Sequence, residues 1–166
     1  QDGAGIATIK LDIPPGNRYI SRHRSIGSSY LKDLFDSVYE NFADCTPEQL
    51  NDASWLKTNK PYTGELLMGH LRYGTHGANN IETVHPFLRQ NNWISRNLVC
   101  AGNFNMTNID ELFNELLSFG QYPKEVSDTV TVMEKIGHFL DDEVQTVFEN
   151  YKKQGFSNIE INKFIE

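Results

Sequence analysis

The stretch Ala7–Ile13, with the sequence ATIKLDI, alternates apolar and polar side chains along its whole length. A period of two residues is typical of a β-strand with one buried face. Pro14 and the residues after it form a PPGN sequence that turns the chain. The arginine-rich segment Arg18–Ser25 can then return as a second strand, placed near an edge or on a polar face. The start of the chain is therefore predicted to form an antiparallel sheet.

Helices are predicted wherever a capping residue precedes apolar residues at helical spacing. The first follows Ser28 and Ser29, with an apolar stripe that runs from Leu31 to Phe42. Further helices are predicted to begin at Thr46, Asn108, Ser127 and Ser157. Gly120 and Gly155 are the predicted stops of the helices that begin at Asn108 and Ser127.

Two short apolar runs, Glu65–Leu71 and Asn97–Ala101, are predicted to be buried strands. The segment Gly74–Asn92 between them is polar and shows neither period, which predicts a functional or disordered loop. Because strands and helices follow in no regular βαβ order, the sequence predicts an α+β fold.

The composition is that of a globular domain with a real core. The chain has 166 residues, of which 39% are apolar and 22% charged, and a formal net charge of −7. It contains no apolar run that approaches the roughly 20 residues of a membrane span, and its acidic balance disfavours nucleic acid as a partner. Two cysteines make no disulfide framework and fit a reducing compartment such as the cytoplasm. The first residue is Gln1 rather than Met, and the last helix stops just after apolar residues, so we expect a fragment of a longer protein.

Polar residues gather where predicted strands meet loops, in the segments 69–77, 85–89, 101–108 and 127–129. Arg72 offers a planar fork for a carboxylate, or a partner for any surface acid. Asp128 can accept from an ammonium group, or simply cap a helix. Asn103 can donate to an oxyanion, or serve as a turn residue. If these segments converge, they predict a site for a free α-amino acid with a reactive carbonyl at its far end.

The histidines and cysteines give weaker signals. His70, His76 and His85 are spaced six and nine residues apart, which fits no standard zinc pattern, so we expect no metal. Cys100 lies within an apolar strand and is predicted to be an inert buried thiol. Cys45 has no histidine nearby in sequence, which disfavours a catalytic role.

Taken together, these segments resemble the class II glutamine amidotransferases, which are N-terminal-nucleophile hydrolases. The opening residues QDGAG are similar to the end of the family motif Arg-Gly-Gln-Asp/Glu-x-Ala-Gly, and GHLRYGTHG (69–77) is similar to Gly-His-x-Arg-(Tyr/Trp)-(Ser/Ala)-Thr-x-Gly. The later segments HPF (85–87), NFNMTN (103–108) and SDT (127–129) follow in the order and spacing of the family. Within it, the Arg-Tyr pair and the Asn-Met-Thr-Asn form are most similar to the amidophosphoribosyltransferases.

The resemblance implies a four-layer αββα fold, incomplete over residues 1–166, and a glutaminase mechanism. A cysteine at the mature N-terminus attacks the side-chain amide of glutamine, with its own α-amino group as the base. A glutamyl thioester forms, ammonia leaves and water releases glutamate. The family roles fall on the following residues: Arg72 for the substrate carboxylate, Thr75 and His76 for the closing loop, Asn103 and the Phe104 N–H for the oxyanion hole, and Asp128 for the substrate ammonium.

This sequence departs from the family pattern at three points. Gln1 is not a thiol, so the nucleophile and the strand that carries it are absent, and the chain alone is expected to be inactive. Phe104 replaces a glycine, and a left-handed backbone there would cost about 1–2 kcal/mol. Gly102 and Val130 replace a common His and Glu.

The resemblance also implies what surrounds this fragment. It predicts a phosphoribosyltransferase domain elsewhere in the parent chain, where phosphoribosyl pyrophosphate with Mg²⁺ accepts the ammonia in purine biosynthesis, and a homo-oligomer. No cofactor is expected within residues 1–166. One alternative is a glutaminase domain that serves another acceptor, such as a sugar phosphate or 2-oxoglutarate. Another is a degenerate, non-catalytic binding module.

Overall fold

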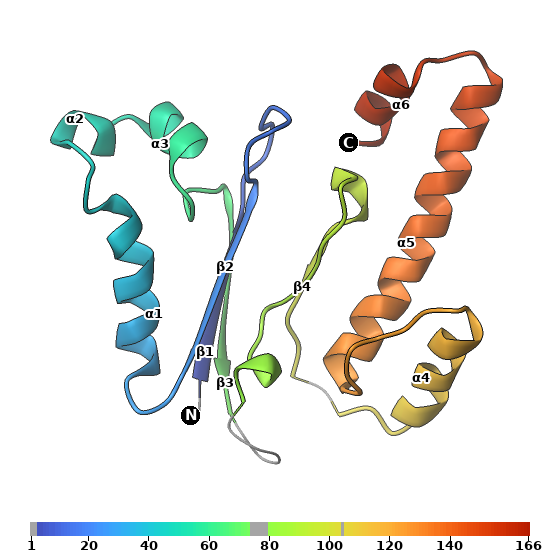
Figure 1. The fold of residues 1–166 in the computed structure, drawn as a ribbon, viewed down its shortest axis with the longest axis horizontal. Helices are drawn as coiled ribbons and strands as arrows, with labels where there is room; N and C mark the ends of the chain where they lie inside the picture. Colours follow the sequence, from blue (N-terminus) through green and yellow to red (C-terminus); the bar gives the residue numbers. More distant parts are fainter. Residues whose placement is uncertain (1–2, 74–79, 104) are drawn as a thin grey trace. The chain divides into compact units, whose positions relative to one another are not determined.

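The computed structural model describes residues 3–73, 80–103 and 105–166 (Figure 1). Strands and helices follow one another without regular alternation, which confirms the predicted α+β class. The chain divides into two compact units, Gln1–Pro86 and Phe87–Glu166. Within the described ranges, no helix is both long and apolar enough to cross a membrane. The single four-layer domain stays a prediction.

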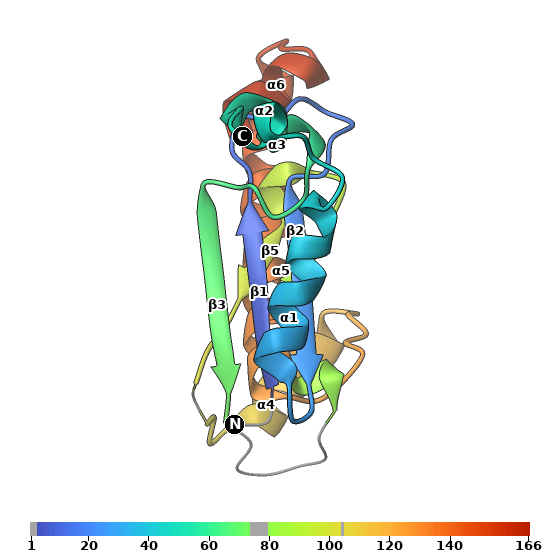
Figure 2. The same ribbon diagram turned by 90° about the vertical axis from the view of Figure 1, so that its left-hand side faces the viewer.

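The first unit is built on a three-stranded antiparallel sheet in the order β2-β1-β3. The strands are β1 (Gly3–Ile9), β2 (Ile20–Ile26) and β3 (Leu66–Arg72), and Figure 2 shows β1 between the other two. The edge position predicted for the arginine-rich strand is confirmed. The strand predicted over Ala7–Ile13 is wrong in its bounds, because Asp12 adopts a φ of 48° and the chain turns before the prolines.

Helix α1 (Tyr30–Tyr39) covers one face of the sheet, over β1 and β2 (Figure 2). Leu34 and Val38 of α1 pack against Ala4 and Ile6 of β1 and form the core of this unit. Only part of the predicted apolar stripe is buried against the sheet, because three of its members remain exposed: Leu31, Phe35 and Tyr39.

Strand β3 has the predicted position but not the predicted burial. It is an edge strand of the described sheet, and α1 does not cover it. Leu67 and Leu71 are 68% and 50% exposed, so the apolar run did not signal a buried strand here.

Two short helices, α2 (Pro47–Leu50) and α3 (Ala53–Asn59), connect α1 to β3. The capping box predicted at Thr46 is confirmed, since its side chain accepts from the Gln49 N–H and the Gln49 side chain accepts from the Thr46 N–H. Single 3₁₀ turns lie at Glu40–Phe42, Ile81–Thr83 and Ile94–Arg96.

The second unit consists of a hairpin and three helices. The hairpin pairs β4 (Phe87–Arg89) with β5 (Leu98–Cys100), and the helices are α4 (Ile109–Ser118), α5 (Asp128–Lys153) and α6 (Asn158–Ile165). The long loop predicted over 74–92 is therefore wrong in its later part, which contains a 3₁₀ turn and β4. Phe87 of the hairpin packs against Val130 and Met133 of α5.

The helix boundaries of this unit follow their predicted signals closely. Ser127 caps α5 through its side chain, and Ser157 forms a full capping box with Glu160. Gly120 and Gly155 follow their helices with φ values of 79° and 94°, as predicted for C-terminal stops. Asn108 precedes α4 but makes no side-chain capping bond, so that predicted capping box is wrong.

Candidate functional site

Arg72 is the last residue of β3, where it pairs with Gly3 of β1. Its side chain is largely buried, with 8% of the residue exposed. Within the described residues it forms no ion pair and no hydrogen bond with a carboxylate. The described residues thus supply no carboxylate to this guanidinium, and its predicted role toward a substrate carboxylate stays a prediction.

Two histidines lie beside this arginine. The rings of His70 and His85 approach with centroids 4.4 Å apart. Burial, followed by the positive charges of His70, Arg72 and Arg24, lowers the pKa of His85 to about 4. Burial also lowers the pKa of His70, so both imidazoles are neutral at neutral pH.

The segment Val84–Pro86 lies against the sheet face opposite α1. Two arginines of β2 hold it there: Arg22 donates to the Pro86 carbonyl (3.3 Å) and Arg24 to the Val84 carbonyl (3.2 Å). A Cβ at Gly5 would lie 2.0 Å from the His85 carbonyl oxygen, so only glycine permits this approach. The Gly-Ala-Gly of the opening motif thus has a packing role here that the sequence did not reveal.

Asp128 is the first residue of α5, and its carboxylate reaches the segment 103–107. The backbone N–H of Met106 donates to Oδ2 of Asp128 (2.8 Å). The N-cap of α5 is Ser127, whose Oγ accepts a hydrogen bond from the Val130 N–H (3.2 Å). Ser127 rather than Asp128 is therefore the N-cap of α5, and the described hydrogen bond of Asp128 is a structural contact to Met106. The predicted role of Asp128 toward an ammonium group stays a prediction.

The predicted site residues fall into separate groups. Asp128 and the segment that contains the exposed Asn103 belong to the second unit, whereas Arg72 belongs to the first. Their convergence on one cavity stays a prediction. Thr75, His76 and Phe104 lie outside the described residues.

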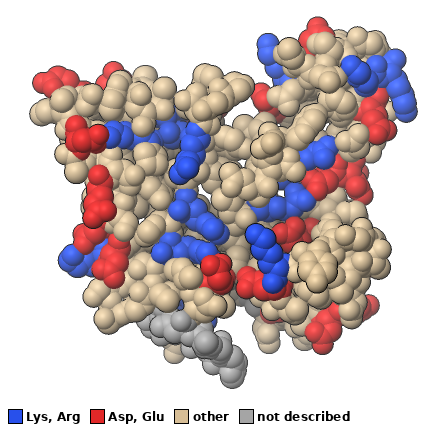
Figure 3. All heavy atoms as spheres, viewed as in Figure 1, with Lys and Arg blue, Asp and Glu red and all other residues tan. Residues whose placement is uncertain are grey.

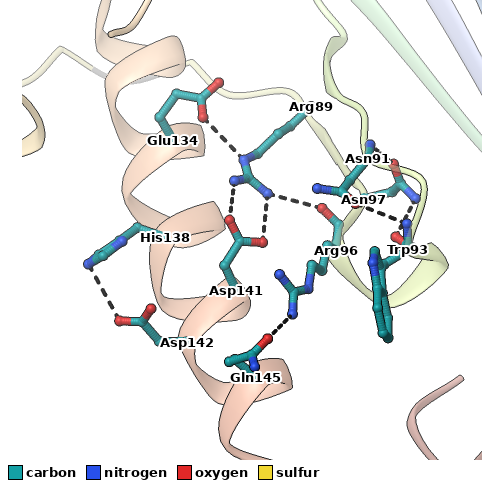
Figure 4. Close-up of polar contacts among 10 residues, drawn as sticks. All are labelled: Arg89, Asn91, Trp93, Arg96, Asn97, Glu134, His138, Asp141, Asp142 and Gln145. Atoms are coloured by element: carbon teal, nitrogen blue, oxygen red, sulfur yellow. Dashed lines mark hydrogen bonds and ion pairs between the residues drawn. The ribbon is translucent and has the colours of Figure 1, made fainter. Parts of the chain in front are cut away.

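Arg89 is the polar residue that the sequence analysis underestimated. Its Nε bonds to Glu134 (3.1 Å), and its Nη1 donates to Asp141 (3.2 Å) and to the Arg96 carbonyl (3.1 Å), as Figure 4 shows. This charge is fully partnered and joins β4 to α5, so its role is structural. Glu134, Gly137 and Asp141 recur on one helix face, and that spacing is the signal from which the contact was predictable.

The remaining reactive side chains offer little chemistry. Cys45 and Cys100 are free thiols, and burial raises the pKa of Cys100, which disfavours its thiolate. Among the described residues, no three His, Cys, Asp or Glu side chains gather as metal ligands. On the face drawn in Figure 3, each unit carries basic and acidic side chains close together rather than one extended basic surface.

No protein-family model matches the chain. Three curated proteins are similar to it. An amidophosphoribosyltransferase of Lacticaseibacillus casei is 29% identical over 136 residues, which are 82% of this chain and 56% of that protein. An amidophosphoribosyltransferase of Archaeoglobus fulgidus is 31% identical over 80 residues, which are 48% of this chain and 17% of that protein. A glutamine–fructose-6-phosphate aminotransferase of Zymomonas mobilis is 28% identical over 97 residues, which are 58% of this chain and 14% of that protein.

The chain thus spans between about a seventh and just over half of the length of these relatives. The similarity supports the class II glutamine amidotransferase family, which the motifs also resemble.

Proposed function

We propose that this chain carries the glutamine-recognition part of a class II glutamine amidotransferase. The observation that carries the proposal is Arg72, a largely buried arginine at a strand end for which the described residues supply no carboxylate. The α-carboxylate of glutamine matches that requirement in charge and shape. The motif around Arg72 and the similarity to amidotransferases point to the same ligand.

The other groups of the pocket are assigned by their chemistry. Asp128 supplies the negative charge for the α-ammonium group, and Asn103 supplies an amide N–H for the oxyanion that forms at the side-chain carbonyl. The Phe104 N–H is the second oxyanion donor, and Thr75 and His76 belong to the loop that closes over glutamine.

Within the reaction, these residues bind and orient glutamine, while the attacking thiolate comes from a cysteine at a mature N-terminus. Among the 166 residues, neither Cys45 nor Cys100 matches the nucleophile position of the family motif. We therefore expect the 166-residue polypeptide to bind glutamine without hydrolysing it. Ammonia release above background by this polypeptide would refute that expectation.

For the parent protein we propose amidophosphoribosyl transfer, in which ammonia displaces pyrophosphate from Mg²⁺-bound phosphoribosyl pyrophosphate on a separate transferase domain. The support is that the amidophosphoribosyltransferase of L. casei aligns with 82% of the chain, against 58% for the sugar-phosphate relative. A sugar-phosphate acceptor is the second candidate, favoured by that latter similarity.

The test is calorimetric titration of the 166-residue chain with L-glutamine and with 4-aminobutanamide, which lacks the α-carboxylate. Arg72→Ala is expected to weaken glutamine binding roughly ten- to a hundredfold, the value of one charged hydrogen-bonded contact. It should not change binding of 4-aminobutanamide, since that ligand has no carboxylate to lose. Arg18→Ala removes an exposed arginine from the same unit and is the matched control.

Two results would count against the proposal. If the wild-type chain binds neither ligand, the recognition function fails and a degenerate module becomes the better description. If Arg72→Ala weakens both ligands equally, Arg72 does not bind the carboxylate.

A further inference from the structure

The start of α5 is joined to the segment 103–107 through one carboxylate. Because the Ser127 side chain already caps the helix, the Asp128 carboxylate is free to turn outward, and its Oδ2 accepts from the Met106 N–H at 2.8 Å. The two residues lie 22 positions apart in the chain, so this contact is tertiary rather than local.

The described residues around Met106 belong to no helix or strand, so a tertiary hydrogen bond can fix their backbone. No strand or helix includes the described residues between Cys100 and Ile109. The bond is charge-assisted and partly buried, which makes it about twice as strong as one between neutral groups. Asp128 also lies in the first turn of α5, where the helix dipole favours a negative charge.

The second carboxylate oxygen of Asp128 takes no part in the hydrogen bond to Met106. Oδ1 of Asp128 has no hydrogen-bond partner among the residues that the structure describes. One oxygen thus holds the backbone of the segment, while the other remains available to a ligand.

We propose that Asp128 is a positioning residue for the segment 105–107, and that the carboxylate which receives the ammonium of glutamine also orders this segment, which follows the oxyanion donor Asn103 in the chain. The part of this inference that concerns ammonium binding rests on the proposed function, whereas the positioning of the backbone does not. Occupation of Oδ1 by the ammonium holds the carboxylate in place and thereby tightens the Met106 contact. Substrate binding and the order of this segment are then coupled without any movement of α5.

The positioning half is tested by amide hydrogen exchange at Met106, measured by NMR on the full 166-residue chain. Asp128→Ala should lower the protection of the Met106 amide at least about tenfold relative to the amides of α5, because the charged acceptor is lost. Asp128→Asn keeps a carbonyl acceptor and should restore most of that protection. Ser127→Ala, the matched control, weakens the start of α5 and should leave the ratio of Met106 to α5 protection unchanged.

The ligand half is tested by adding L-glutamine to the same samples. Saturating glutamine should raise Met106 protection in the wild type, and Asp128→Asn should weaken glutamine binding roughly ten- to a hundredfold while Met106 stays protected. If Asp128 had only a structural role, Asp128→Asn would not lower the affinity for glutamine while the Met106 amide stays protected. Unchanged Met106 protection in Asp128→Ala would overturn the positioning role. Failure of the wild type to bind glutamine, with the exchange results intact, would overturn the proposed function and the coupling but not the positioning.

Discussion

Replacing Gly137 by alanine should destabilise the second unit, although the same change in an ordinary helix interior stabilises by about 0.5–1 kcal/mol. Gly137 lies in α5, where a Cβ would be 2.3 Å from Nε and 2.7 Å from Cζ of Arg89. The Arg89 side chain cannot easily retreat, because Glu134, Asp141 and the Arg96 carbonyl hold it and only 16% of it is exposed. Loss of one or two of these charged hydrogen bonds, at about 1.5–3 kcal/mol each, outweighs the gain in helix propensity. We expect a net loss of about 1–3 kcal/mol in the free energy of unfolding.

Urea unfolding, monitored by tryptophan fluorescence, measures this change in the free energy of unfolding for the second unit. Trp93 packs against Phe148 within the second unit, and a Trp55→Phe background leaves it as the only reporter. The decisive control is Arg89→Ala, which itself destabilises but removes the obstructing side chain. In that background Gly137→Ala should stabilise by about 0.5–1 kcal/mol, so the sign of the effect reverses. A higher unfolding midpoint for Gly137→Ala in the presence of Arg89 would refute the reasoning.

Three further predictions concern the first unit. Gly5→Ala should destabilise by about 2–4 kcal/mol, because the new Cβ would lie 2.0 Å from a backbone oxygen of His85, whereas Gly69→Ala, with no atom within 4 Å, should be nearly neutral in the same unfolding assay. The pKa of His85 is about 4 when folded against 6.5 unfolded, so stability should fall as pH drops from about 6.5 towards 4. For this half-buried group the loss is roughly 1–2 kcal/mol after discounting for solvent, and it should vanish from the pH profile of His85→Gln. Glutamine bound at Arg72 should raise the pKa of His85, because a carboxylate offsets a positive neighbour, and NMR titration that shows no shift would contradict that placement.

The helices were the most predictable part of the fold because their signals are local. Ser127, Ser157 and Thr46 each cap a helix as their sequence context predicts, and Gly120 and Gly155 stop one in a left-handed conformation. A capping bond needs only residues within one turn, so the sequence window contains the whole interaction.

The central sheet was harder to predict, since burial of a strand depends on what packs against it. β1 is buried along almost its whole length, and its glycines leave space for close neighbours, Val84 beside Gly3 and His85 beside Gly5. The alternation of apolar and polar residues instead predicted a strand that continues beyond Ile9, through the buried Lys10 and the more exposed residues 11–13. β3 carries an apolar run without the expected cover, which no pattern within the run itself distinguishes from a buried strand.

The candidate site turns on a contrast between two arginines that look alike in the sequence. Arg72 and Arg89 both close a short strand next to a polar loop, and both are largely buried. Arg89 forms ion pairs with Glu134 and Asp141, which lie on the same face of α5, so its charge is neutralised within the fold. Arg72 meets no carboxylate among the described residues, and its neighbours His70 and His85 are neutral at neutral pH because burial lowers the pKa of both. Only the tertiary distribution of acids separates the two. It makes Arg89 a structural anchor, whereas the carboxylate that the proposed function assigns to Arg72 stays a prediction.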